Sequence, residues 1–226
     1  MREGAYGRGG RLMWLAGGVV AVVALYVVLD FLTTLERLEA VERERDTWQR
    51  PGDIVRALAL GDGAVVADIG CGSGYLALKL ARVVGARGRV VALDVRELPV
   101  FVIRFRAWRA RLESLRAVRV PPEDPLLPAG GVDAAVVLNT YHELGDPAAM
   151  LAKIHDGLRP GGRLVVVDRR PRAVEAGARP GDHEVPASVV QVALQDRGFT
   201  VTSRDDTFID RPGDADVWWM LVARRD

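Results

Sequence analysis

Short apolar runs recur along most of this chain and alternate with polar or glycine-rich segments. The runs are four to eight residues long and rich in valine, too short for helices, so they predict buried strands of a parallel sheet. Longer segments between them have helical periodicity, and this alternation is typical of an α/β domain. The predicted strands are residues 65–69, 88–95, 117–120, 132–139, 163–168, 199–202 and 217–222.

A long apolar run near the N-terminus has a different pattern. Residues 12–29 contain no charged side chain, and as a helix they would span about 27 Å, close to the thickness of a bilayer's hydrocarbon layer. Trp14 and Tyr26 lie near its ends, where interfacial aromatic side chains are common. The run is apolar all round, which argues against a buried core helix. We expect a transmembrane helix over residues 12–32, after a tail over residues 1–11.

A cleaved signal peptide is the alternative, because Arg2, Arg8 and Arg11 precede the apolar run. The run is long for a signal peptide and lacks a small-x-small cleavage site, so we favour an uncleaved, single-pass membrane anchor. Arginines flank both ends of the run, so the positive-inside rule does not give the orientation.

Residues 33–50 are highly charged and carry Leu35, Leu38 and Val41 at helical spacing. They predict a helical stalk between the anchor and a single domain over residues 51–226. The 49% hydrophobic content is ample for one core, and the net charge of +1 gives no support for a nucleic-acid partner. Three scattered histidines and a single cysteine predict no metal site and exclude an intramolecular disulfide.

The strand predicted at 65–69 contains Asp68 and leads directly into three alternating glycines. Such a turn can adopt positive φ and lets a ligand approach the backbone closely. A helix predicted from Tyr75 onward would offer free N–H groups to an anionic ligand group. A dinucleotide-binding fingerprint would require glycine where Tyr75 stands, which disfavours a nicotinamide cofactor. The glycines are Gly70, Gly72 and Gly74.

This G-x-G-x-G pattern, two residues after an acid, resembles the first motif of the class I S-adenosylmethionine-dependent methyltransferases. The resemblance extends over roughly residues 45 to 226 and implies a doubly wound, seven-stranded, mostly parallel Rossmann-like sheet. Residues 199–202 and 217–222 would form the antiparallel hairpin that closes it, after the family's Leu-Arg-Pro-Gly-Gly turn at 158–162. The implied contacts with S-adenosylmethionine are Asp68, Gly70, Cys71, Gly72, Gly74 and Tyr75.

The resemblance assigns further roles to acids at the ends of the next strands. Asp94 lies where doubly wound folds place a carboxylate on the ribose hydroxyls, and the alternative is that it caps the helix beginning near Glu97. After the third strand the family places an acid that recognises adenine. Two adjacent acids stand there, and we favour Asp124 over Glu123.

In the same family the end of the fourth strand faces the methyl group and the acceptor. Asn139 would contact the cofactor, and the candidate catalytic residues are Tyr141, His142 and Glu143. His142 could act as a general base, or could only hydrogen-bond the loop. A bacterial subgroup shares this Tyr-His pair and a D-x-W-Q-x-P segment, here residues 46–51. Glu143 replaces a histidine common in that subgroup, which leaves the role of the loop open.

Two further segments have less certain roles. Phe101, Phe105, Trp108, Leu112 and Leu115 form an apolar stripe that we expect in the core. The other face of this helix predicts a solvated surface or, alternatively, one for anionic lipid headgroups. Its arginines are Arg104, Arg106, Arg109, Arg111 and Arg116. After the fifth strand, a loop over 171–186 contains His183, a candidate acceptor contact.

The sequence therefore predicts a membrane-anchored, S-adenosylmethionine-dependent methyltransferase that acts on a small or lipid-like acceptor. Supply of that cofactor inside cells favours a cytoplasmic catalytic domain. A non-catalytic, cofactor-binding scaffold module at the membrane is the alternative, and a nicotinamide oxidoreductase is a more distant one.

Overall fold

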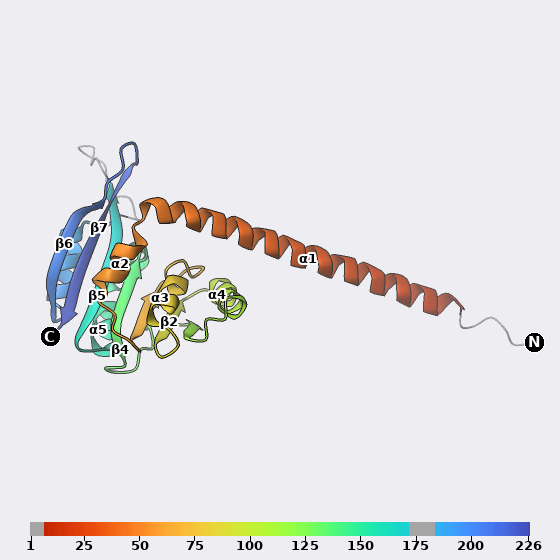
Figure 1. Ribbon diagram of the computed structural model, residues 1–226, viewed down its shortest axis with the longest axis horizontal. Helices are drawn as coiled ribbons and strands as arrows, with labels where there is room; N and C mark the ends of the chain where they lie inside the picture. Colours follow the sequence, from red (N-terminus) through yellow and green to blue (C-terminus); the bar gives the residue numbers. More distant parts are fainter. Residues whose placement is uncertain (1–6, 172–183) are drawn as a thin grey trace, which may run out of the picture. The chain divides into compact units, whose positions relative to one another are not determined.

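A computed structural model describes residues 7–171 and 184–226 of the chain, which divides into two compact units, residues 1–48 and 49–226. In the first unit, α1 (Gly7–Trp48) is one continuous helix of 42 residues (Figure 1). From Ala16 onward α1 is long and apolar enough to cross a membrane, a property that it shares with signal sequences near an N-terminus. The predicted anchor and stalk therefore lie on a single helix.

The second unit is built on a seven-stranded sheet with the order β3-β2-β1-β4-β5-β7-β6. Strands β1 to β5 are parallel, and β7 is antiparallel to both of its neighbours, β5 and β6. The predicted α/β fold with a mostly parallel sheet is confirmed. The strands are β1 (Val65–Ile69), β2 (Arg89–Asp94), β3 (Leu115–Arg119), β4 (Val132–Leu138), β5 (Leu158–Pro171), β6 (Phe199–Ile209) and β7 (Asp216–Arg225).

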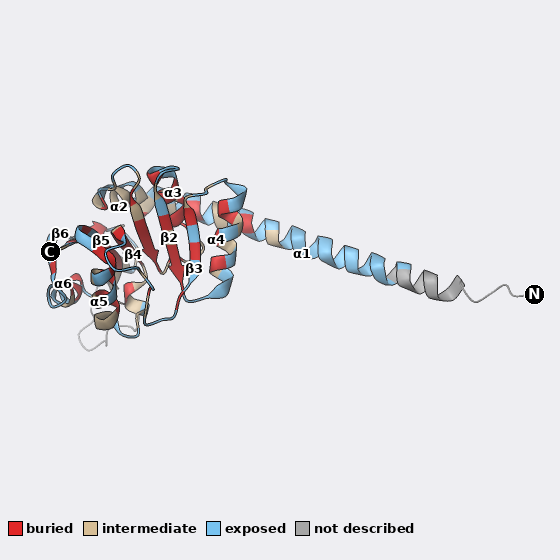
Figure 2. Ribbon diagram, turned by 90° about the horizontal axis from the view of Figure 1, so that it is seen from below, coloured by how far each residue is buried: buried red, intermediate tan, exposed pale blue. Residues whose placement is uncertain are grey.

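Helices cover both faces of this sheet. Figure 2 shows α2 and α3 on one face and α5 and α6 on the other. The helices of this unit are α2 (Pro51–Ala57), α3 (Ala77–Val84), α4 (Glu97–Arg109), α5 (Pro147–Gly157) and α6 (Ala187–Gln195), with a 3-10 turn η1 (Tyr141–Glu143). Strands covered on both faces must be apolar on both sides, which is why the central strands are continuous apolar runs and not alternating ones.

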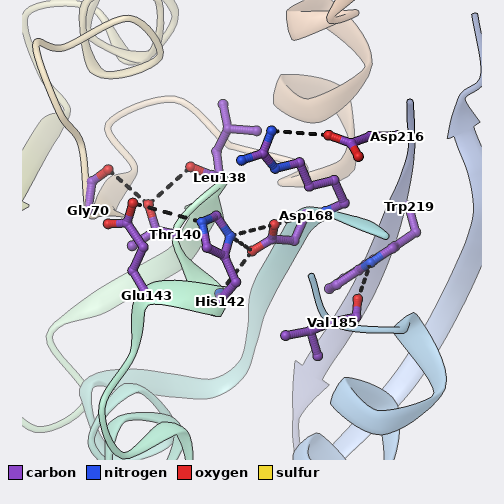
Figure 3. Close-up of polar contacts among 10 residues, drawn as sticks. Gly70, Leu138, Thr140, His142, Glu143, Asp168, Val185, Asp216 and Trp219 are labelled. Carbon is purple, nitrogen blue, oxygen red and sulfur yellow. Dashed lines mark hydrogen bonds and ion pairs between the residues drawn. The ribbon is translucent and has the colours of Figure 1, made fainter. Parts of the chain in front are cut away.

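The core lies between the central strands and the helices that flank them. Val66 and Ala67 of β1 and Trp219 of β7 are fully buried. The indole Nε1–H of Trp219 donates to the Val185 carbonyl oxygen at 2.7 Å, so the polar group of this large side chain is satisfied. This contact ties β7 to the segment before α6 (Figure 3).

The helix after the glycine turn begins at Ala77, two residues later than predicted from the sequence. The turn continues through Gly74, whose φ is 93° and whose N–H donates to the Cys71 carbonyl oxygen at 3.0 Å. Because a residue with positive φ cannot belong to a right-handed helix, α3 can start only after this turn.

The expectation that the aromatic stripe of α4 lies in the core is wrong. Phe101 is 54% exposed and Trp108 is 74% exposed. The buried residues of α4 are Val100, Ile103, Arg106 and Ala107, so the prediction of a solvated face is also wrong for Arg106. Two apolar stripes share this helix, and periodicity alone does not say which of them faces the sheet. Of the predicted stripe, Leu115 is buried, but it belongs to β3. His183 and most of the predicted 171–186 loop lie outside the described residues.

Candidate active site at the carboxyl ends of the strands

The glycine turn lies at the carboxyl end of the central strand β1, between β2 and β4. In open parallel sheets this edge is where ligands bind, and the strand order reverses here. The N–H groups of Gly70 and Cys71 both donate to the Leu93 carbonyl oxygen of β2, at 2.8 and 3.0 Å. The turn is therefore held at the junction between β1 and β2.

The glycines of this turn face different surroundings. A Cβ at Gly70 would collide with the side chain of Thr140, so only glycine fits where the loop meets the end of β4. A Cβ at Gly72 would meet no described atom within 4 Å, and the φ of Gly72 is 52°. The backbone at Gly72 is thus open to a ligand, whereas Gly70 is closed off by the Thr140 side chain.

Asp68 is a buried acid directly beneath this turn, with 2% of its surface exposed. Burial raises the pKa of Asp68 to about 7. A hydrogen bond from the Ala77 N–H opposes this shift, and the nearby charge of Asp94 adds to it. Its Oδ2 atom is buried and accepts no hydrogen bond from the described part of the chain. A buried carboxylate oxygen without a partner is costly, so a ligand that brings a positive charge would relieve it.

Cys71 and Tyr75, the other predicted cofactor contacts in the turn, are both buried. Burial raises the pKa of the Cys71 thiol, which therefore stays protonated at neutral pH. This protonation argues against Cys71 as a nucleophile. The ring of Tyr75 lies 4.6 Å from Lys79 Nζ, a cation–π contact that holds the ring against α3.

Asp94, predicted to bind ribose, is brought to the glycine turn at the end of β2. Its Oδ2 accepts from the Gly72 N–H at 3.0 Å, and its Oδ1 accepts from the N–H and the Nε of Arg96 at 2.9 and 3.2 Å. Asp94 is not the N-cap of α4, because the N-cap residue is Arg96, whose side chain makes no cap hydrogen bond. The carboxylate instead links the glycine turn to the start of α4.

Asp124, predicted to recognise adenine, lies in the loop after β3. Its Oδ1 accepts from the Leu126 N–H at 2.8 Å, and its Oδ2 lies 3.3 Å from Lys153 Nζ on α5. The hydrogen bond from Leu126, followed by the contact with Lys153, lowers the pKa of this carboxyl group. These contacts fix the loop, and the adenine contact stays a prediction. The competing acid, Glu123, is exposed.

At the end of β4 the backbone is strained. Asn139 has a φ of 53°, in the left-handed region that asparagine adopts more readily than most residues other than glycine. Its Oδ1 is buried without a hydrogen-bond partner among the residues described. Such strain at the end of a central strand is typical of functional sites. The next residue, Thr140, donates from its hydroxyl at 3.2 Å to the Gly70 carbonyl oxygen, which couples this strand end to the glycine turn (Figure 3).

His142 pairs with a buried acid of the neighbouring strand (Figure 3). Its Nδ1 lies 2.8 Å from Oδ1 of Asp168 in β5, and its backbone N–H donates to Asp168 Oδ2 at 3.1 Å. The Asp168 side chain is fully buried and that of His142 is 2% exposed. Because the carboxylate occupies Nδ1, a neutral imidazole has its lone pair on Nε2. His142 is therefore held in the tautomer that a general base needs.

The other two candidate catalytic residues differ in burial. Tyr141 is 4% exposed and belongs to the apolar core, and this burial raises the pKa of its hydroxyl. Glu143 is exposed, and its Oε1 lies 3.8 Å from His142 Nε2. Glu143 thus lies beside Nε2, the imidazole nitrogen that does not contact Asp168. The catalytic roles of both residues stay predictions.

Asp168 is the site residue to which sequence reasoning gave no role. The signal was present, because Asp168 ends the apolar part of a predicted strand just as Asp68 and Asp94 do. The contact itself depends on strand pairing: β5 lies next to β4, which brings Asp168 within hydrogen-bond distance of His142. The described residues contain no cluster of histidine, cysteine or acidic side chains that could hold a metal ion.

Comparisons with known proteins agree with this geometry. Residues 67–164 match the family profile Methyltransf_12, described as a methyltransferase domain. The ubiquinone biosynthesis O-methyltransferase of Acinetobacter baumannii is 29% identical over 115 residues, which are 49% of this chain and 47% of that protein. The chain spans less than half the length of these curated relatives.

Solved structures share the fold at low identity. A SAM-dependent methyltransferase from Aquifex aeolicus has a TM-score of 0.68 at 22% identity, with 78% of this chain and 90% of that one covered. The cyclase SpnF also has a TM-score of 0.68, at 19% identity, with 83% and 81% covered. Residues 67–164 thus match a methyltransferase-domain profile, and about four fifths of the chain shares its fold both with a SAM-dependent methyltransferase and with a cyclase.

Proposed function

We propose that this chain transfers a methyl group from S-adenosylmethionine to a small or membrane-associated acceptor. One observation carries the proposal: the glycine turn that leaves the backbone open at Gly72 directly follows Asp68, whose buried Oδ2 has no hydrogen-bond partner among the residues described. An amino-acid ligand with an ammonium group fits this pair, because the ammonium offsets the buried charge while the glycine allows close approach. The methyltransferase domain match supports this choice over a nicotinamide cofactor.

The remaining cofactor contacts follow the strand ends. Asp68 and the turn from Gly70 to Tyr75 would hold the methionine part, and Asp94 the ribose hydroxyls. Asp94 already orients the Gly72 N–H, so it would link the two subsites. Asn139 would lie against the cofactor with its orphan Oδ1, and Asp124 would recognise the adenine.

The bound cofactor supplies an electrophilic methyl group on a sulfonium, so the protein must position an acceptor and manage one proton. Holding the two reactants in line can provide most of the rate enhancement. His142 Nε2 would take the proton of the acceptor's hydroxyl group, while Asp168 stabilises the imidazolium that forms. Such general-base assistance contributes about 10² to 10⁴ in rate. This pairing favours a hydroxyl acceptor, whose proton must leave.

The chemical character of the acceptor is inferred from the relatives and from α1. The matching Acinetobacter protein is named for an O-methylation in ubiquinone biosynthesis. Another fold neighbour is a geranyl diphosphate C-methyltransferase from Streptomyces coelicolor. We therefore favour an apolar or amphipathic small molecule. An enzyme held at a membrane would meet such an acceptor where it partitions.

We also propose that residues 12–32 anchor the chain in a membrane with the catalytic domain in the cytoplasm, where its cofactor is made. Support comes from the exposed apolar residues of α1, among them Val20 and Leu25. An epitope fused before Met1 should remain on the mature, membrane-bound chain. Its loss from a chain that stays soluble would instead show a cleaved signal peptide.

The decisive experiment is calorimetric titration of the full chain in detergent with S-adenosylmethionine, S-adenosylhomocysteine and NAD. Both adenosyl ligands should bind, NAD should not, and Asp94→Ala should abolish binding. Asp62→Ala, which removes an exposed ion pair with Arg87, is the matched control and should bind normally. Failure of the folded wild type to bind either adenosyl ligand would contradict the proposal.

A second assay separates an enzyme from a scaffold. S-Adenosylhomocysteine formation in membrane extracts should depend on the chain and on His142. Cofactor affinity without turnover in any extract would favour the non-catalytic module. The fold is compatible with functions other than methyl transfer, because the cyclase SpnF shares it.

A further inference from the structure

The outer face of α4 carries large apolar side chains that the sheet does not cover. Leu98 is 69% exposed, Phe101 54% and Trp108 74%, and Phe105 is partly exposed. These four residues, here called the α4 outer face, recur at intervals of three and four and so form one stripe along the helix. The rings of Phe105 and Trp108 lie 5.7 Å apart. Contiguous exposed aromatic surface of this kind marks an interaction site.

The surroundings of the α4 outer face are basic. Arg104 and Arg109 flank the stripe on its two sides by helical position, and both are exposed. Between residues 97 and 119 five arginines are exposed, against two glutamates, one of which lies 4.0 Å from an arginine. The arginines are Arg104, Arg109, Arg111, Arg116 and Arg119, and the glutamates are Glu97 and Glu113.

The opposite face of α4 packs against the glycine turn. Ile103 packs against the glycine turn so closely that a Cβ at Gly74 would lie 2.8 Å from its Cγ1. Arg106 is buried and donates from Nη1 to the Ser73 carbonyl oxygen at 2.8 Å. The helix therefore cannot rotate to bury its aromatic stripe without losing these contacts, and the outer face stays outward.

We propose that the α4 outer face binds the surface of an anionic lipid bilayer. Aromatic rings with flanking arginines suit the boundary between headgroups and acyl chains, where rings bury apolar area and guanidinium groups meet phosphates. Self-association through the same face would bring the arginines of two copies together, which like-charge repulsion disfavours. This inference does not depend on methyl transfer.

Binding there would also place the candidate site at the membrane surface. The helix α4 begins three residues after Asp94, and its inner face holds the glycine turn. Docking the outer face would thus orient the carboxyl edge of β2 with respect to the bilayer, in addition to any tethering by residues 12–32. An acceptor dissolved in the membrane could then enter from that side.

The test uses the full chain in vesicles of phosphatidylcholine, with and without phosphatidylglycerol. Trp108→Cys carries a polarity-sensitive fluorophore, and Val189→Cys on α6, with 56% exposure at Val189, is the matched control. Cys71 is buried and does not compete for the label. The label at 108 should shift to the blue only with phosphatidylglycerol, and the label at 189 should not shift.

Salt and charge reversal sharpen the result. High salt, or the pair Arg104→Glu and Arg109→Glu, should abolish the shift at 108, because both remove attraction to phosphate groups. An emission maximum at 108 that is the same in both kinds of vesicle would overturn the proposal. If that shared maximum were blue-shifted, the stalk residues 33–48 or a second copy would cover the face. Unchanged cofactor affinity in the charge-reversed pair would keep this test separate from that of the catalytic site.

Discussion

Asp68 at the end of β1 and Asp168 near the end of β5 are both buried acids at the carboxyl edge of one sheet, with 2% and 0% of their surfaces exposed. Their oxygens are satisfied differently. Asp168 accepts from the backbone N–H and the ring of His142 and from the Arg169 N–H at 2.8 Å. Asp68 leaves Oδ2 without a partner in the described part of the chain, and burial raises its pKa to about 7.

The difference shows that burial alone does not define the role of a carboxylate. A fully hydrogen-bonded acid such as Asp168 fixes a neighbour, here the tautomer and orientation of His142. An acid with an orphan oxygen, such as Asp68, is suited to a ligand that supplies the missing positive charge. One half of the candidate site is thus preorganised by the protein, and the other half is completed by the cofactor.

The largest effect should come from the preorganised half. Asp168→Asn should lower turnover about 10² to 10⁴-fold, because the new amide N–H can donate to His142 Nδ1 and so favour the tautomer whose Nε2 carries the proton. Affinity for S-adenosylmethionine should stay within a factor of two or so, since the hydrogen bonds of Asp168 in the described part of the chain go to His142 and Arg169 and to no predicted cofactor residue. Turnover is measured as S-adenosylhomocysteine release, and affinity by calorimetry.

Asp133→Asn is the control for that variant. Asp133 lies at the opposite end of the sheet, where its Oδ2 accepts from the Val65 N–H at 2.6 Å. Removing either satisfied carboxylate should cost about 2 kcal/mol of stability. Only Asp168→Asn should reduce turnover. If Asp133→Asn lowered turnover by the same factor, the role of Asp168 would be structural only.

The second effect concerns stability and pH. Between about pH 4 and 7 folded Asp68 keeps a proton that the unfolded chain has lost, so the free energy of unfolding should fall as pH rises through this window. With a pKa near 7 against the ordinary 3.8, the loss from this group is at most about 4 kcal/mol. Urea unfolding of wild type and Asp68→Asn at pH 5 and pH 8 measures it. The variant should gain clearly more stability relative to wild type at pH 8 than at pH 5, where only about a third of the loss has occurred. A gain of the same size at both pH values would contradict the assignment.

The third prediction tests whether the cofactor completes the Asp68 half. Asp68→Asn should weaken S-adenosylmethionine binding by about 10- to 100-fold, because a charge-assisted contact with the ammonium group is lost. Wild-type affinity should rise between pH 5 and 8 as Asp68 ionises, whereas the affinity of the variant should not. A variant that binds as tightly as wild type would place the ammonium group elsewhere.

The smallest effect separates backbone strain from ligand space. Gly72→Ala and Gly130→Ala both place a side chain at positive φ, 52° and 58°, with no described atom within 4 Å of the new Cβ. Each should cost about 1 kcal/mol of stability. Only Gly72→Ala should also weaken cofactor binding, because its methyl group occupies the proposed ligand space. Equal affinity of the two variants would argue against a ligand over Gly72.

The glycine turn could be predicted from the sequence because its parts are consecutive. Asp68, three glycines and a helix start follow one another within a few residues, so local chemistry defines the motif without knowledge of the neighbours. Asp94 could be placed because the strand–helix–strand unit fixes its distance along the chain. The exact start of α3 was missed, because the positive φ at Gly74 extends the turn.

The aromatic stripe of α4 could not be placed in the same way. Ile103 and Phe101 each belong to an apolar stripe with helical spacing. The sequence therefore allows either of two faces of α4 to pack in the core. The face with Ile103 also carries Arg106, whose buried guanidinium donates to the Ser73 carbonyl oxygen of the glycine turn. This contact holds the Ile103 face against the turn and leaves the Phe101 face outward. A long-range hydrogen bond of this kind leaves no periodic trace in the sequence.

By itself the sequence determined the parallel α/β fold, the glycine turn with its acid, and an apolar N-terminal helix long enough for a membrane, since each is a local pattern set by side-chain size and periodicity. Only the tertiary structure decided that Asp168 orients His142, that Asp68 keeps an orphan oxygen, and that the aromatic side of α4 faces outward. These three depend on which strands and helices become neighbours, and that is fixed by packing of the whole sheet.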